Sequence, residues 1–204
     1  MSPARTLLLL LIIAASFGLV CAQRRDRVPP PRDSQAYEPR TKLEEFESRM
    51  GTILVKGRTY VATLRPTGGG GSVRVEALEV RDTGNSTRTT GVVVTIAPTA
   101  ANGSAQGEVR SLIDYEDIDA LIKAFDTAAK ADESLTKLTH FEVRYRALGD
   151  FEIVVYKQVS GGVTTLVEGG LYTRTRLSLT LDEFIKLRWF ISQAKDRLDE
   201  IPMP

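Results

Sequence analysis

The chain of 204 residues has only one cysteine, one histidine and one tryptophan. Cys21 lies in an apolar N-terminal segment, so a mature chain that begins after Ala22 has no disulfide, no thiol catalysis and no cysteine metal site. His140 precedes a predicted strand, and no G-x-S-x-G or H-E-x-x-H pattern gives it a partner. We therefore predict that the protein is not an enzyme and that it has no catalytic, cofactor-binding or metal-binding residues.

An excess of charge of one sign is also missing. The chain has 27 Lys and Arg residues against 26 Asp and Glu residues, a net charge of +1. The only charged residue before position 23 is Arg5, so its removal leaves a net charge of zero. A neutral chain has no long-range attraction to polyanions or to an anionic membrane surface. On this ground we do not expect nucleic acid as the partner.

Residues 1–22 have the pattern of a signal peptide. Arg5 precedes an unbroken apolar run, and Val20-Cys21-Ala22 suits cleavage before residue 23. The apolar run is short for a membrane span of roughly 20 residues and no second run follows. We expect an exported protein, secreted or periplasmic, without a transmembrane segment after cleavage. Lipid attachment at Cys21 is not expected, because Val20 stands where a small residue is required.

The remaining chain divides into a linker and a domain. Residues 23–41 are rich in Arg and Pro and poor in apolar side chains, which predicts a disordered linker. It is a spacer or, as the alternative, a ligand for a proline-binding domain. Residues 42–204 predict one globular domain with a single core. It begins with a short helix that places Leu43, Phe46 and Met50 on one side.

The C-terminal stretch organises the predicted fold. Leucines alternate with polar residues over 177–181, which is strand spacing. Apolar residues then follow at helical steps of three and four, at Phe184, Leu187, Ile191, Ala194 and Leu198. Between them, Thr180 and Glu183 have the spacing of a capping box. This pattern predicts a strand that runs directly into a long helix.

The same pattern occurs once earlier in the chain. Asp114 takes the place of Thr180 as the expected cap, and Ile118, Leu121, Phe125 and Ala128 form the apolar stripe. About four alternating runs precede each helix. We predict an α+β fold of antiparallel meanders, each closed by a helix, as two pseudo-repeats over about 52–131 and 138–200. The alternative is that two capped amphipathic helices align by chance.

Within the first half, four runs are typical of strands: 53–55, 60–64, 73–80 and 92–96. The apolar phase slips by one residue at Ala77, which predicts a bulge or a twist there. Two sequons for N-glycosylation, at Asn85 and Asn102, lie in predicted loops. The sequence does not decide whether either of them is used.

The order of a meander and a strand that enters a capped helix, over about 53–198, resembles the single-stranded-nucleic-acid-binding fold of the coactivator positive cofactor four. The doubled form resembles the plant Whirly proteins. This topological likeness implies a module that binds single-stranded DNA. Three segments also resemble uncharacterised exported bacterial proteins of about this length, a group without an assigned activity: 115–123, 135–146 and 177–184.

Two sets of residues are candidates for a binding surface. Arg144 with Arg146, and Arg174 with Arg176, each project from one face of a predicted strand near Tyr172, and together could contact a polyanion. Acidic residues in the same strands favour a solvated face of paired charges instead. The acidic run 114–119 lacks the spacing of a calcium loop, and capping explains it.

Trp189 and Ile185 form the second set. Both lie opposite the apolar stripe of the C-terminal helix, on its nominally polar face. We expect them to contact another helix or another subunit of a homo-oligomer. The function predicted from all of these features is a non-catalytic exported module that binds an unknown protein or surface partner. The alternatives are a Whirly-type nucleic-acid-binding module and a hydrolase with an unrecognised site.

Overall fold

The computed structural model describes residues 38–100, 103, 107–158, 161–171 and 173–202. The predicted signal peptide and the linker up to residue 37 lie outside these residues. Pro39–Pro204 form one compact unit. Its elements in chain order are α2 (Lys42–Glu47), β1 (Leu54–Leu64), β2 (Gly71–Asp82), β3 (Thr87–Pro98), β4 (Val109–Asp114), the 3-10 turn η1 (Tyr115–Asp117), α3 (Ile118–Ala129), the 3-10 turn η2 (Glu133–Leu135), β5 (Glu142–Arg146), β6 (Glu152–Lys157), β7 (Val163–Gly169), β8 (Thr175–Leu179) and α4 (Leu181–Asp199).

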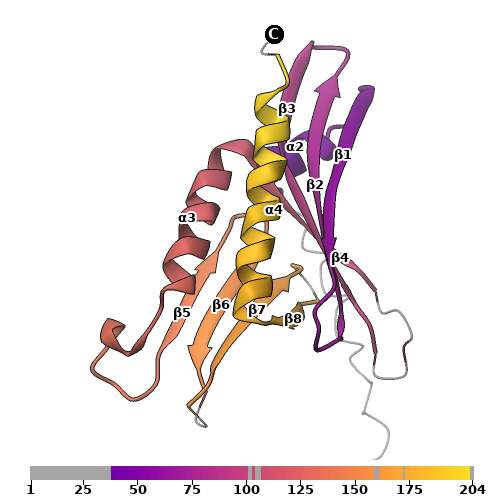
Figure 1. Ribbon diagram of the computed structural model, residues 1–204. Helices are drawn as coiled ribbons and strands as arrows, with labels where there is room; N and C mark the ends of the chain where they lie inside the picture. The colour runs from indigo at the N-terminus through magenta and orange to yellow at the C-terminus, as the bar shows by residue number, and fades with distance from the viewer. Residues whose placement is uncertain (1–37, 101–102, 104–106, 159–160, 172, 203–204) are drawn as a thin grey trace, which may run out of the picture. The chain divides into compact units, whose positions relative to one another are not determined.

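The strands form two sheets of four, with the orders β1-β2-β3-β4 and β5-β6-β7-β8. All neighbouring strands are antiparallel, and a helix follows each sheet (Figure 1). The predicted α+β fold of two meanders, each closed by a helix, is confirmed. α3 packs on β5 and β6, whereas α4 contacts strands of both sheets.

The cap of α4 is the predicted capping box. The Thr180 hydroxyl accepts from the Glu183 backbone N–H at 3.2 Å, and the Glu183 carboxylate accepts from the Thr180 N–H at 2.8 Å. The second oxygen of Glu183 accepts from the N–H and the hydroxyl of Thr67, each at 2.7 Å. The same carboxylate therefore caps the helix and fastens the turn between β1 and β2 to it.

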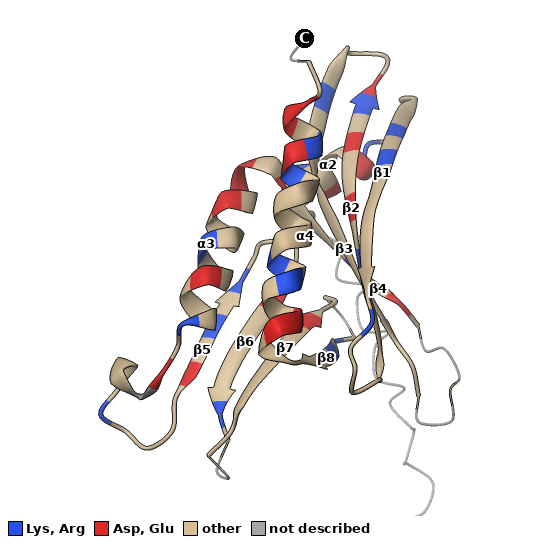
Figure 2. Ribbon diagram, in the orientation of Figure 1, with Lys and Arg blue, Asp and Glu red and all other residues tan. Residues whose placement is uncertain are grey.

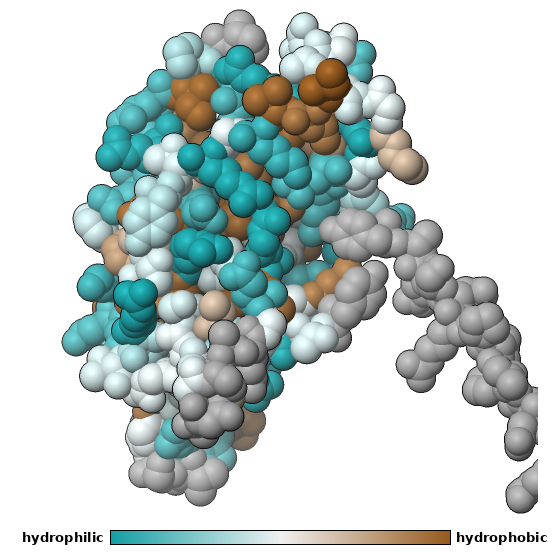
Figure 3. All heavy atoms as spheres, turned by 90° about the vertical axis from the view of Figure 1, so that its right-hand side faces the viewer, coloured by the Kyte–Doolittle hydropathy of each residue, from teal (hydrophilic) through white to brown (hydrophobic). Residues whose placement is uncertain are grey.

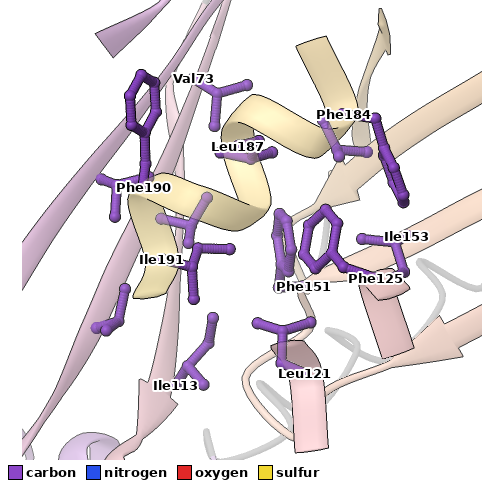
Figure 4. Packing of buried hydrophobic residues seen from close by; sticks show 14 of the residues in the cluster. Val73, Ile113, Leu121, Phe125, Phe151, Ile153, Phe184, Leu187, Phe190 and Ile191 are labelled. Atoms are coloured by element: carbon purple, nitrogen blue, oxygen red, sulfur yellow. The ribbon is translucent and has the colours of Figure 1, made fainter. Parts of the chain in front are cut away.

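The main core lies between the two sheets and the two long helices. α4 runs between strands of the first sheet and strands of the second (Figure 4). Phe125 of α3 packs on Phe184 of α4, with ring centroids 4.6 Å apart, and on Phe151 at the start of β6, 6.4 Å away. The structure adds Phe190 to the buried stripe expected for α4. Both repeats thus share one core.

A smaller core covers the opposite face of the first sheet, where α2 packs. Leu43 and Phe46 of α2 lie against Leu78 and Val80 of β2. Val73, Val75 and Ala77 of β2 instead face the main core. The phase slip at Ala77 therefore marks a change of buried face. The register of β2 with β3 is unbroken there, and the irregularity expected near Ala77 lies in the pairing of β2 with β1, opposite Val75 and Glu76.

The register shifts in β1 instead, between Tyr60 and Ala62. This strand also joins the two runs 53–55 and 60–64, which the sequence separated. Residues 56–59 are exposed, because β1 is an edge strand whose first half is covered on neither face. Without a buried face, that stretch has no alternating apolar pattern from which a strand could be predicted.

Two expectations for helix ends are corrected. Asp114 does not cap the helix that follows it; its buried carboxylate accepts from the backbone N–H groups of Lys42 and Leu43, at 2.7 and 3.0 Å, and so caps α2. Thr41 completes a capping box at the same end of α2. Met50, expected on the buried side of this helix, lies beyond its end and is exposed.

The two sheets meet where the turn between β5 and β6 packs on β4. A Cβ atom on Gly149 would lie only 1.7 Å from the carbonyl oxygen of Leu112. Next to it, Asp150 pairs with Arg40 at 2.6 Å, ahead of α2. Close backbone contact thus fixes the second sheet against the first, and only glycine fits at this position.

We predict that Gly149→Ala destabilises the fold by about 1–3 kcal/mol, the usual cost of overpacking. The matched control is Gly68→Ala, because a Cβ at Gly68 meets no atom within 4 Å. Chemical denaturation of both variants measures the difference. Equal unfolding free energies would contradict the tight contact.

Glu183 provides a test of the helix cap by pH. Desolvation raises the pKa of its carboxyl, but the hydrogen bonds from Thr180 and Thr67 lower it more, to about 2. A native pKa below the ordinary value of 4.5 stabilises the folded state above that pH, and this contribution is lost as the pH falls towards 2. Glu183→Gln should be less stable than the wild type at pH 7, with the difference shrinking between pH 4.5 and 2. A difference independent of pH in urea titrations would refute this.

Candidate functional site

The four arginines singled out in the sequence lie on the face of the second sheet that points away from α3 and α4. Strand register places Arg146, Glu152, Glu168 and Arg176 in one row across β5, β6, β7 and β8. Because side chains alternate along a strand, Arg144 lies on the same face two residues earlier. We name the set Arg144, Arg146, Arg174, Arg176, Glu152 and Glu168 the arginine face.

Two buried glutamates hold these arginines in place. The side chain of Glu152 is 0 % exposed and pairs with Arg144, Arg146 and Arg174, the contact with Arg146 measuring 2.7 Å. Glu168 pairs with Arg176 at 3.2 Å and with Arg174 at 3.5 Å. Arg174 thus bridges the two carboxylates, and the whole row forms one network.

The network keeps the central carboxylate ionised. Desolvation raises the pKa of Glu152, but the hydrogen bonds from Arg174 and Arg146 lower it more, so that its pKa lies below the ordinary value. The four guanidinium groups remain 37–71 % exposed. Four cations lie over two buried anions, and Glu142, which pairs with Arg144 at 2.9 Å, adds a third anion at the edge. The face therefore carries an excess of one positive charge.

This arrangement suits the binding of flat anions. Each guanidinium has five N–H donors and uses only one or two of them in the pairs with glutamate. The remaining donors are already oriented, because buried carboxylates hold the side chains. Carboxylates and phosphates both match the planar fork of arginine. The face can therefore bind anions.

The sequence located the arginines but not the centre of the site. From the sequence alone, Glu152 and Glu168 are only two of the acidic residues whose charges balance those of the arginines. Their burial follows from the register, which sets each of them opposite an arginine on the neighbouring strand. Tyr172, the aromatic residue expected beside the arginines, lies outside the described residues.

The second candidate surface, on α4, is exposed. Trp189 and Ile185 are 52 and 49 % exposed, and neither belongs to the buried residues of the two cores. The Trp189 ring lies 5.6 Å from that of Phe190, which turns into the core. Ile53 and Val55, at the start of β1, are also exposed apolar residues. Figure 3 shows patches of brown surface on this largely hydrophilic side of the molecule.

The features considered for catalysis are His140 and the acidic run 114–119. His140 is exposed ahead of β5. Within the acidic run, Asp114 caps α2, Glu116 pairs with Lys42 at 2.5 Å, and Asp119 lies 3.9 Å from Lys195. The described part of the chain contains no cluster of His, Cys, Asp and Glu that could hold a metal ion.

A hollow of about 740 Å³ adjoins the turn between β2 and β3. Its buried Asp82 accepts hydrogen bonds from Thr52, Asn85 and Gly84, and those from Thr52 and Asn85 contribute most to lowering its pKa to about 2. The sequon residue Asn85 donates its side-chain amide to Asp82 at 3.0 Å. The Asp82 carboxylate therefore orders the turn beside this hollow. The sequon at Asn102 lies outside the described residues.

We predict that Glu152→Gln lowers the unfolding free energy by about 2–3 kcal/mol at pH 7, because it removes the buried charge that three arginines share. The control is Glu142→Gln, since Glu142 is half exposed and pairs with Arg144 alone. Its removal should cost less than about 1 kcal/mol. Equal losses in denaturant titrations would show that the network does not depend on the buried carboxylate.

Comparisons with known proteins add no relative. No family model matches the chain, and neither a curated protein nor a solved structure is significantly similar to it. None of the helices in the described residues is long and apolar enough to cross a membrane. The site must therefore be interpreted from its own geometry.

Proposed function

We propose that the protein is a non-catalytic binding module that holds an acidic segment of a partner protein on its arginine face. The observation that supports this proposal is the set of four half-exposed guanidinium groups fixed by two buried glutamates. Buried charges are costly unless they are paired, and this pairing orients the arginine side chains.

Arginines that are already held in place favour binding, because their side chains lose little further conformational entropy when the partner binds. A flexible arginine loses side-chain entropy when it is immobilised by a ligand. Here Glu152 anchors three guanidinium groups, and each keeps donors for a further carboxylate. An acidic segment would add further carboxylates to the arginines that flank Glu152 and Glu168 in the row.

The distribution of charge favours an acidic protein segment over nucleic acid. Lys and Arg alternate with Asp and Glu over the described elements and form no continuous basic stripe (Figure 2). Binding of nucleic acid depends on many phosphate contacts along such a stripe. The arginine face, with an excess of one positive charge once Glu142 is counted, suits a short segment with a few carboxylates.

A second candidate function is the binding of single-stranded nucleic acid, which the four-strand and helix repeat favours through its resemblance to Whirly proteins. Tyr156 lies four residues after Glu152 in β6, on the same face of the sheet, and offers one ring for base stacking. The two candidates differ in their expected dependence on salt.

We further propose, from residues 1–22, that the partner is met after export.

The test compares a fluorescein-labelled oligoglutamate peptide with a labelled oligothymidylate of similar charge, by anisotropy at low salt. The double variant Arg144→Gln/Arg176→Gln removes two exposed charges and leaves Arg146 and Arg174 to hold the glutamates. It should weaken peptide binding about tenfold or more, the loss of roughly one charge-assisted contact.

The control for this experiment is Arg58→Gln/Arg65→Gln, which changes the charge equally on exposed residues at β1. Peptide binding that is absent, or that both double variants weaken alike, would refute the arginine face as the site. Tighter binding of the oligothymidylate, with a steep fall in affinity as salt rises, would support the nucleic-acid alternative instead.

A further inference from the structure

A stripe of three large apolar residues runs along the exposed side of α4. Leu181, Ile185 and Trp189 follow one another at steps of four residues, and their exposed fractions are 45, 49 and 52 %. Residues four apart on a helix form a continuous ridge, the kind that packs into the grooves of another helix. We name these three residues the apolar stripe of α4.

The stripe is not needed to fold this chain. The opposite side of α4 supplies the main core, through Phe184, Leu187, Phe190 and Ile191. On one flank, Arg188 makes a bidentate pair with Asp126 of α3, at 2.9 and 3.0 Å. The contacts of α4 with the core and with α3 are therefore complete without the stripe, which faces outward.

Two charged residues, Asp182 and Lys186, follow the other flank of the stripe. Both are exposed, and within the described residues neither forms an ion pair. They are one helical turn apart, the acid nearer the helix start. If a second copy of α4 ran beside this one in the opposite direction, its Lys186 would lie level with Asp182 of this copy, and its Asp182 would lie level with Lys186.

We propose that the stripe binds a second copy of this chain, with the two α4 helices antiparallel about a two-fold axis near Ile185. In a two-fold interface, residue i contacts j of the partner, and j contacts i. Ile185 is the midpoint between Leu181 and Trp189, so it would meet its own copy while the other two meet each other. The midpoint of Asp182 and Lys186 is residue 184. A two-fold axis that pairs Asp182 of one copy with Lys186 of the other therefore lies within one residue of the axis that pairs the apolar residues.

This agreement between the apolar and the charged residues is what selects a second copy as the occupant. For an unrelated partner, the apolar and the charged residues of α4 need only match that partner's surface. For self-association, both sets must in addition be complementary to themselves about the same two-fold axis. Three side chains cover less than the roughly 800 Å² per partner of a standard interface. The dimer is therefore weak and forms in a concentration-dependent way.

Sedimentation of the full chain from about 1 to 500 µM tests the dimer. The wild type should shift from monomer to dimer, and the emission of Trp189, the only tryptophan, should shift to shorter wavelengths as it does so. Ile185→Glu and Trp189→Glu should remain monomeric with unchanged melting temperatures. The matched control Leu138→Glu, at a residue 76 % exposed in the connector before β5, should dimerise like the wild type.

Charge exchange tests the antiparallel arrangement. Asp182→Lys and Lys186→Asp should each weaken the dimer several-fold, because like charges then face each other, and the double variant Asp182→Lys/Lys186→Asp should restore it. Since an acid at a helix start also stabilises the helix, each variant is compared at equal folded fraction by circular dichroism. A wild type that is monomeric throughout, or a double variant no stronger than the single ones, would overturn the proposal. Peptide binding at the arginine face, on the other side of the second sheet, is measured separately.

Discussion

Packing of α4 against both sheets is the interaction on which the rest of the structure depends. Leu187 and Ile191 bury the inner face of the first sheet, while Phe184 reaches Phe125 and the second sheet. Neither four-strand meander covers its own apolar face, so each relies on a helix. The last helix of the chain serves both, which makes the two repeats one cooperative unit and explains why the carboxylate that caps α4 also holds the β1–β2 turn.

The first sheet requires cover on both faces, and this requirement explains the position of α2. β2 faces the main core in its first half and α2 in its second, where Leu78 and Val80 are completely buried. A helix of six residues is not stable alone, so it depends on docking and on its caps. Asp114 provides a cap from β4, and this single buried carboxylate joins the N-terminal helix to the strand that precedes α3.

Local patterns in the sequence predicted most of the architecture. The capping box at Thr180 and the switch from alternating to helical spacing depend on neighbours in the chain, and both were read correctly. The cap expected at Asp114 was wrong because a partner far away in the chain decides its role: Asp114 caps α2 and not the helix that follows it. At Ala77, one buried face of β2 ends, and the register shift beside it belongs to the neighbouring strand β1. The arginines could be grouped from strand spacing, but the burial of Glu152 depends on register across three strands, which spacing does not give.

The two proposed surfaces lie on opposite sides of the second sheet, and this separation has a consequence for binding. The arginine face points away from the helices, whereas the apolar stripe of α4 points outward from the helix side. A dimer through α4 would leave both arginine faces uncovered. Two weak sites linked in this way bind a partner that carries several acidic segments much more tightly than one site does, provided that the spacing of those segments matches. A small excess of positive charge on each face is then sufficient, because the affinity arises from two binding sites and not from a strong electrostatic field at one of them.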